Sequence, residues 1–144
     1  MTRSAVVDDL IEALAKLPSI GAKTSERLAF HLLRIDRQEA LGLAAKIRAA
    51  VESTLTCRTC FNLDDVDPCR ICADQDRDGS LVLVVEDPRD IGAFEAAEFR
   101  GLFHVLQGRV STTEGIGPSA LTIPQLVRRV QSNAVQEGCL ATTP

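Results

Sequence analysis

The pattern of apolar and polar positions predicts two helices joined by a tight turn near the start of the chain. Apolar side chains recur every three or four residues from Val7 to Leu17, which is the spacing of one helical face. Pro18 and Gly21 then interrupt this pattern. A second helix is predicted directly after the glycine, over about residues 22–34.

A third helix is predicted after the sequence "DRQE". Asp36 can cap its first turn, and Glu39 can reach back to complete a capping box. An apolar stripe then runs from Ala40 to Leu55. Residues 1–56 are therefore expected to form a small helical domain.

The last third of the chain has a different pattern, typical of an α/β unit. The run "LVLVVE" over residues 81–86 is short, apolar and β-branched, as in a buried parallel strand. We expect a helix over 91–98, a second strand at "FHVL", residues 103–106, and a helix over about 124–130. The segment "AVQEGCLATT" is predicted to start a third strand.

Between these two regions lie four of the five cysteines, in "CRTCFNLDDVDPCRIC". Two CxxC pairs eight residues apart favour a metal site over disulfides in a chain of cytoplasmic character. Zinc fits best, because it takes four soft ligands in a tetrahedron, and a site filled by four thiolates has a structural rather than a catalytic role. Two disulfides, a redox CxxC and an iron–sulfur cluster are the alternatives. The predicted ligands are Cys57, Cys60, Cys69 and Cys72.

Composition and charge place the chain among ordinary globular proteins. It is 45% hydrophobic with a net charge of −4, and no stretch approaches the about 20 apolar residues of a membrane span. The opening "MTRSAVVDDLIEAL" reaches two aspartates before any long apolar run, so we expect no signal peptide and a cytoplasmic protein. Only residues 1–56 are net positive, with eight Lys and Arg against seven Asp and Glu.

The turn "LPSIGAK" is a candidate phosphate-binding site. Gly21 can adopt a positive φ, and the helix after it begins with unpaired N–H groups and a positive dipole. Lys23 and Arg27, one turn apart, add two cations to the same face. The alternative is an ordinary helical corner with solvated basic side chains.

Three other features are expected to carry no ligand. The sequence "DQDRDG", Asp74–Gly79, matches the opening of a calcium-binding EF-hand loop, but Val85 occupies the place of the bidentate glutamate. His31 and His104 are interpreted as a helix residue near the basic face and a strand residue. Cys139 is interpreted as a small core residue rather than a fifth ligand.

The order of these segments resembles the RecR family of bacterial recombination mediators along nearly the whole chain. The resemblance rests on "LPSIGAKTSERLAFHLLR", the two CxxC pairs, and "LVLVVEDPRDIGAFEAAEFRGLFHVLQGRVSTTEGIGPSAL". It implies an α+β multi-module protein with a helix-hairpin-helix domain over 1–56, a four-cysteine zinc finger over 57–80 and a Toprim domain, of Rossmann-like α/β type, over 81–144.

The resemblance also implies a function. The family binds DNA without base specificity at single-stranded gaps, acts with RecF- and RecO-type proteins, forms homo-oligomers, and helps replace single-strand-binding protein with the RecA recombinase. Gly21, Lys23 and Arg27 match its DNA-contacting positions, and the four cysteines match its zinc ligands. Ser19 departs from the usual glycine, so strain is expected in the hairpin.

We predict no enzymatic activity. Toprim enzymes hold magnesium with an acid after the first strand and an Asp-x-Asp pair after a later one. Glu86 occupies the first place, but the last aspartate of the chain is Asp90. A magnesium-dependent nuclease or primase-like enzyme, and a zinc-ribbon module that binds only protein, are the alternatives.

The family resemblance further predicts that the Toprim domain is incomplete at its C-terminus. In the family, a segment like "AVQEGCLATTP" is followed by more strand, helix and a tail that joins subunits. We therefore expect a weakened C-terminal third with an exposed strand edge, and an impaired ring assembly.

Overall fold

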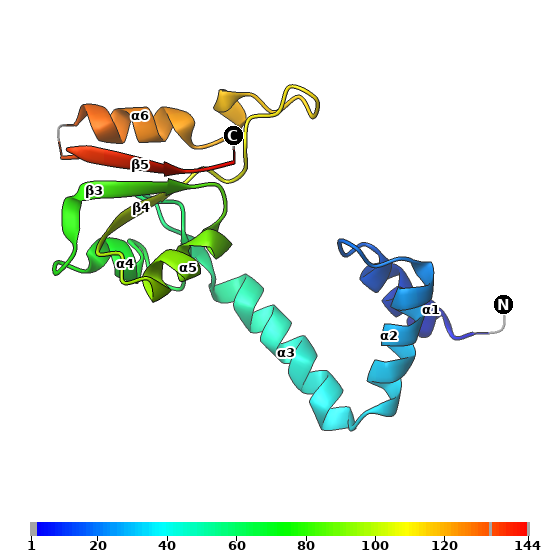
Figure 1. Ribbon diagram of the computed structural model, residues 1–144. Coiled ribbons are helices and arrows are strands. Elements are labelled where there is room, and N and C mark those ends of the chain that lie inside the picture. The colour runs from blue at the N-terminus through cyan, green and yellow to red at the C-terminus, as the bar shows by residue number, and fades with distance from the viewer. Residues whose placement is uncertain (1–2, 133, 144) are drawn as a thin grey trace. The chain divides into compact units, whose positions relative to one another are not determined.

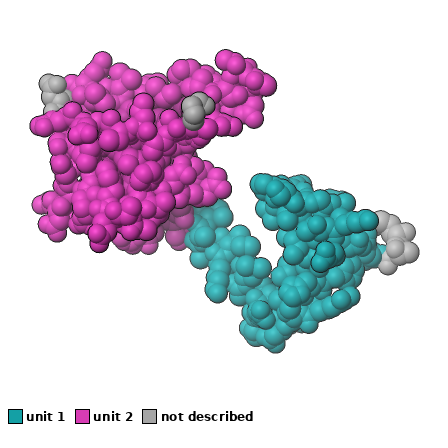
Figure 2. Space-filling view, viewed as in Figure 1, with its two compact units in different colours: residues 1–52 teal, residues 53–144 magenta. Residues whose placement is uncertain are grey.

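The computed structural model describes residues 3–132 and 134–143. It divides into two compact units, unit 1 over residues 1–52 and unit 2 over residues 53–144 (Figures 1 and 2). Each unit is considered by itself below. Among the described residues, no helix combines the length and apolar character needed to cross a bilayer.

Unit 1 is built from helices. They are α1 (Ala5–Ala15), α2 (Ala22–Arg34) and α3 (Arg37–Ser53), which confirms the three predicted helices. Asp36 accepts a hydrogen bond from the backbone N–H of Gln38 at 3.1 Å, as a capping residue does. Gln38 is the second residue of the helix, and neither a bond from Glu39 N–H to Asp36 nor one from Asp36 N–H to the Glu39 side chain is found among the described residues. Asp36 therefore caps α3, but the predicted capping box does not form.

The α1–α2 hairpin closes on small side chains. Ser25 and Ala29 are the buried residues of α2, one turn apart, and small residues let two helices approach closely. The turn between the helices agrees with the prediction in part. Gly21 has an extended conformation with φ −86°, whereas Ser19 has φ +65°. The left-handed residue of the turn is therefore Ser19, in agreement with the strain expected at that position, and Gly21 does not use the positive φ that a glycine allows.

Unit 2 begins with a small antiparallel ribbon. Strand β1 (Leu55–Thr56) pairs with β2 (Leu63–Asp64), and the short helix α4 (Arg70–Ala73) follows. The two CxxC pairs lie on these elements, the first in the turn after β1 and the second at the start of α4. We call residues 55–73 the knuckle.

The rest of unit 2 is a three-stranded parallel sheet. Strands β3 (Asp78–Val85), β4 (Gly101–Val105) and β5 (Glu137–Ala141) lie in the order β4-β3-β5. The first crossover contains η1 (Pro88–Asp90) and α5 (Ile91–Ala96), and the second contains η2 (Pro118–Ala120) and α6 (Ile123–Gln131) (Figure 1). The predicted strands and helices are confirmed, with α5 two residues shorter than expected.

Alternate side chains of β3 pack on opposite faces of the sheet. Leu83 and Val85 pack with Phe103 on the face covered by α5 and the knuckle. Val82 and Val84 pack on the other face, which α6 covers. A short, fully apolar strand is the expected result of burial on both faces.

Strand β5 lies at one edge of the sheet, with its residues Glu137–Leu140 exposed. Cys139 is one of them, so its interpretation as a core residue was wrong. The alternation of the sequence identifies a strand but not whether that strand is central or at an edge, and only the pairing order decides its burial.

Candidate metal centre and nucleic-acid interface

The four predicted cysteine ligands come together in the knuckle. Their Sγ atoms all lie within 4.8 Å of one another, and Cys60 Sγ and Cys69 Sγ are 3.5 Å apart. Tetrahedral zinc with bonds of about 2.3 Å requires sulfur–sulfur separations of about 3.8 Å. The arrangement therefore fits a four-thiolate metal ion. It is the one group of potential ligands with this geometry in the described part of the chain.

Local hydrogen bonds shape each half of the centre. The first CxxC lies in a turn where Phe61 N donates to Cys57 O at 2.9 Å and Cys57 N donates to Asn62 O at 2.7 Å. At the second pair, Cys69 precedes the first turn of α4, and Asp64 accepts a bond from the backbone N–H of Arg70 at 2.9 Å. The aspartates between the two pairs thus position the second pair relative to the first.

The electrostatics of the cluster favour a bound cation. Burial raises the pKa of Cys57, but backbone donors, first that of Cys69, outweigh burial and lower this pKa to about 7. The pKa of Cys60 is raised by its hydrogen bond with Cys72 and by burial. Burial raises the pKa of Cys69 to about 11. Several thiolates at this spacing repel one another, and a divalent cation removes that repulsion.

The knuckle is joined directly to the parallel sheet. Val105 N, at the end of β4, donates to Cys60 O at 2.7 Å, and Gln107 Nε2 donates to Phe61 O at 2.7 Å. The Phe61 ring lies edge-on to His104, with centroids 5.5 Å apart. The metal centre therefore supports the β4 edge of the sheet as well as its own loops.

The hairpin presents the predicted phosphate-binding residues at the start of α2. Gly21 immediately precedes the helix, and no side chain caps the free N–H groups of its first turn. Gly21, Lys23 and Arg27 are all exposed. A Cβ on Gly21 would meet no atom within 4 Å, so the glycine leaves open space where a phosphate can approach the backbone.

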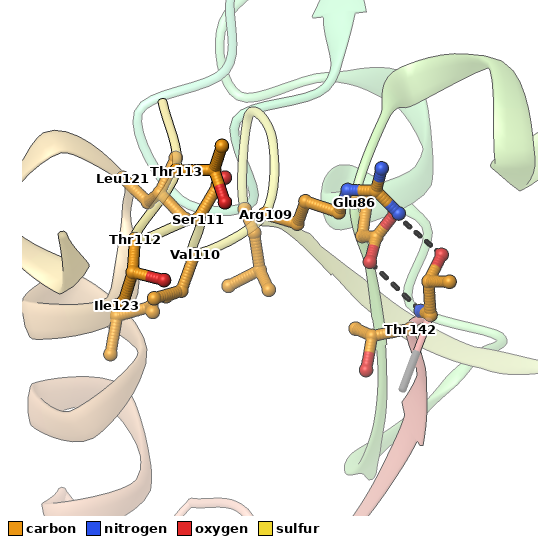
Figure 3. A pocket seen from close by; sticks show the side chains of 11 residues that line it. Glu86, Arg109, Val110, Ser111, Thr112, Thr113, Leu121, Ile123 and Thr142 are labelled. Atoms are coloured by element: carbon orange, nitrogen blue, oxygen red, sulfur yellow. Dashed lines mark hydrogen bonds between the residues drawn. The ribbon is translucent and has the colours of Figure 1, made fainter. Parts of the chain in front are cut away.

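A pocket of about 550 Å³ opens at the carboxyl ends of the parallel strands (Figure 3). Glu86 follows β3, Thr142 and Thr143 follow β5, and Arg109 lies in the loop after β4. Both oxygens of Glu86 accept hydrogen bonds from Thr143, at 2.8 Å from its backbone N–H and 3.1 Å from its hydroxyl. In open α/β sheets this edge is the usual position for ligands.

The sequence revealed only part of this pocket. Glu86 was visible because it ends an apolar strand, but Arg109 and the Ser111–Thr113 stretch lie in a loop without a recognisable pattern. Thr143 was also missed, because its partner is 57 residues away. The signal available was topological: in a parallel sheet, residues that follow neighbouring strands meet at one edge.

The acidic turn at Asp74–Gly79 has a structural explanation. The Arg77 side chain is 6% exposed and pairs with Asp74 at 3.4 Å and with Glu95 of α5 at 2.6 Å. These interactions, with desolvation opposing them, raise the pKa of Arg77. The turn is thus held by an internal cation.

Unit 1 contains a helical hairpin, and unit 2 contains a four-cysteine cluster and a parallel α/β sheet. The chain therefore combines three structural modules. Three family models match in the same order. They describe the helix-hairpin-helix of RecR over residues 7–51, the four-cysteine zinc finger domain of RecR over 56–74, and a Toprim domain over 80–142.

Curated relatives agree with these models. The chain is 50% identical over 139 residues to "Recombination protein RecR" of Heliobacterium modesticaldum, covering 96% of this chain and 70% of the relative. It is 49% identical to the protein of the same name from Moorella thermoacetica, covering 94% and 69%. The relative from Rhodopirellula baltica is 47% identical, with 96% and 70% covered. The chain belongs to the RecR family of recombination proteins.

Proposed function

We propose that this chain is a non-enzymatic recombination mediator. It binds DNA through phosphates at single-stranded gaps and works with RecF- and RecO-type partners to help load the RecA recombinase. Its membership of a family of recombination proteins supports this role. The modest net charge of −4 is compatible with DNA binding, since a local positive face is sufficient.

The observation that carries the proposal is the exposed start of α2. Free helix N–H groups, an unobstructed Gly21, and the two cations Lys23 and Arg27 lie within the first two turns. Such a site neutralises phosphates but has no means of reading base edges, so binding is independent of sequence.

The test is DNA binding measured across salt concentrations. Lys23→Ala with Arg27→Ala should weaken binding to every sequence alike and reduce the slope of log K against log salt by about two. Lys46→Ala with Arg48→Ala removes the same charge from α3 and serves as the matched control. If both double variants lose the same DNA affinity, or neither loses any, the hairpin is an ordinary helical corner with solvated basic side chains, or the protein is a module that binds only protein.

The four cysteines are proposed to hold one structural zinc ion. Their burial and spacing support a closed site without a free coordination position. Elemental analysis should find about one zinc per chain. Finding iron with a visible absorption band, or two intact disulfides, would contradict the assignment.

The absence of catalysis is also a proposal. Both Glu86 carboxylate oxygens already accept hydrogen bonds from Thr143. After β5, where a Toprim enzyme would need acidic residues to hold magnesium, this chain has Thr142 and Thr143. Gapped DNA incubated with Mg²⁺ should stay intact with the wild-type chain and with Glu86→Gln alike. Cleavage or primer synthesis lost in Glu86→Gln would establish the enzyme alternative.

Self-association completes the proposal. Large apolar side chains of α3 are exposed, with Ile47 at 56% and Val51 at 75%, and such surfaces favour subunit contacts. Mass in solution, with and without gapped DNA, tests this. A strictly monomeric chain under both conditions would contradict it.

A further inference from the structure

The stretch of α2 from Glu26 to Arg34 carries a pocket that the hairpin site does not explain. Its volume is about 390 Å³, and its lining consists of Glu26, Arg27, Phe30, His31 and Arg34. Four of these side chains are charged or can carry charge, and the fifth is aromatic. A basic surface with an aromatic ring set into it is the composition of single-strand nucleic-acid sites.

The positions follow one line along the helix. Lys23, Arg27, Phe30 and Arg34 are separated by four, three and four residues, so they share one face of α2. The buried side chain Ser25 lies on the opposite face. From Lys23 to Arg34 this line is about 16 Å long, enough to follow several phosphates of one strand.

Phe30 is unusual in this position because it is a large aromatic residue on the outward face of a helix. It is half-buried, and the Arg34 guanidinium carbon lies 6.0 Å from its ring centroid. The ring and the guanidinium plane together offer the two kinds of surface on which an unpaired base stacks. A base inside a duplex cannot reach them.

The cations on this face are available to a ligand. In the part of the chain that the structure describes, neither Arg27 nor Arg34 forms an ion pair with an acidic side chain. Glu26, the one acid in the pocket lining, is paired instead with Arg3. The face therefore presents positive charge to solvent.

We propose that this face of α2 is a track for a single DNA strand, with Arg34 on a phosphate and Phe30 stacked on an unpaired base. The proposal rests on the phosphate-binding role proposed above for Lys23 and Arg27 and extends it by two helical turns. It gives the hairpin a preference for unpaired DNA, which the helix N-terminus by itself does not provide.

Anisotropy titrations of the full chain with a labelled oligothymidine and with a duplex of equal length test the proposal. Phe30→Leu should weaken single-strand binding at least about fivefold and leave duplex binding within about twofold, whereas Phe30→Tyr should retain the single-strand affinity. Arg34→Ala should reduce the single-strand salt slope by about 0.7, and Arg37→Ala, outside the track, is the control.

The outcomes separate this inference from the proposed function. If Phe30→Leu binds the oligothymidine as tightly as Phe30→Tyr does, and Arg34→Ala keeps the wild-type salt slope, the proposed single-strand track is wrong. The phosphate-binding site at the hairpin is not affected by that result. If the Lys23 and Arg27 double variant also binds normally, the proposed function fails with it. Equal losses with both nucleic acids in Phe30→Leu would assign the ring to the packing of α2 and overturn the stacking role.

Discussion

Unit 1 and unit 2 differ in how completely they bury their apolar side chains. In α1 and α2 of unit 1 the buried residues are Ser25 and Ala29, both small, while Val6 is 77% exposed. Unit 2 buries large side chains completely, among them Phe103 and Val85. One unit therefore has a core of its own, and the other keeps its apolar surface available.

The difference shows where each unit obtains its stability. The hydrogen bonds of unit 1 lie within single helices, so each segment specifies its own element although the unit buries few side chains, and helices this short still need the packing of α1 on α2. Unit 2 depends on contacts between distant segments: β3 with β4 and β5, and the knuckle with β4. Changes to the core or to the metal centre should consequently affect unit 2 and leave unit 1 intact.

The largest effect is expected from the metal centre. Cys69→Ala removes a fully buried ligand, and structural zinc contributes on the order of 10 kcal/mol to the folding of small domains. Because Cys60 O accepts the Val105 N–H, loss of the knuckle should also raise hydrogen exchange in β4. Exchange measured by mass spectrometry should rise across residues 55–105 and stay unchanged in α1 and α2.

The matched control is Cys139→Ser, which alters an exposed cysteine outside the cluster. It should keep both the metal content and the exchange pattern of the wild type. If Cys69→Ala instead increased exchange equally in α1 and α2, the two units would unfold as one and the comparison would fail.

A core substitution should have the next largest effect. Phe103 is fully buried, and its ring lies 5.2 Å from that of Phe99 and 6.4 Å from that of Phe94. Phe103→Ala should lower the free energy of unfolding of unit 2 by about 3–5 kcal/mol. Val6→Ala, at a position of α1 that is 77% exposed, should change stability by less than about 0.5 kcal/mol. Urea unfolding followed by circular dichroism measures both, and similar losses would contradict the contrast between the units.

The same contrast explains how much of the fold could be predicted from sequence. The helices at 5–15 and 22–34 follow local apolar spacing and breakers, and the strand "LVLVVE" is apolar on both faces, so each was visible in its own segment. The clustering of Cys57, Cys60, Cys69 and Cys72 was visible from spacing alone, because CxxC turns bring sulfur atoms together whatever surrounds them.

The features that could not be predicted from the sequence depend on residues far apart in the chain or on exact backbone angles. The exposure of Cys139 follows from the sheet order, and the contact of Glu86 with Thr143 follows from β3 and β5 being neighbours. The attachment of Phe61 to Gln107 likewise joins segments 46 residues apart. At the hairpin, the left-handed residue is Ser19, as the expected strain implied, whereas the positive φ that a glycine allows is not used by Gly21.

A smaller effect concerns the dependence of stability on pH in unit 2. Burial lowers the pKa of His104, the nearby Arg129 lowers it further, and the hydrogen bond with Thr122 opposes both. A histidine with a lowered pKa in the folded state stabilises the fold above its unfolded pKa of about 6.5, and this contribution is lost as pH falls below that value.

Unfolding free energies of unit 2 measured from pH 7.5 to 5.5 should therefore decrease on acidification, by at most about 1.4 kcal/mol per pH unit from this one group. His104→Gln should remove most of that decrease. His31→Gln, on the exposed surface of α2 in unit 1, should retain it. A wild-type slope in His104→Gln would assign the pH dependence to other groups.

The smallest expected effect is in unit 1, at the turn of the hairpin. Ser19 has φ +65°, where a side chain is strained and glycine is not. Ser19→Gly should therefore raise the melting temperature of unit 1, with a gain of about 1 kcal/mol reduced in part by the greater freedom of glycine in the unfolded chain. Gly21→Ala should lower the stability of unit 1 by no more than about 1 kcal/mol, since the φ of −86° suits any residue and an added Cβ would meet nothing within 4 Å.

The same two variants distinguish the effect of backbone conformation on DNA binding from the effect of direct phosphate contact. Ser19→Gly should leave DNA affinity close to wild type, whereas Gly21→Ala should weaken it by obstructing the approach of phosphate to the N-terminus of α2. If Gly21→Ala binds DNA normally and Ser19→Gly gains affinity rather than stability, then the geometry of the turn, and not the open space at Gly21, limits phosphate binding in unit 1.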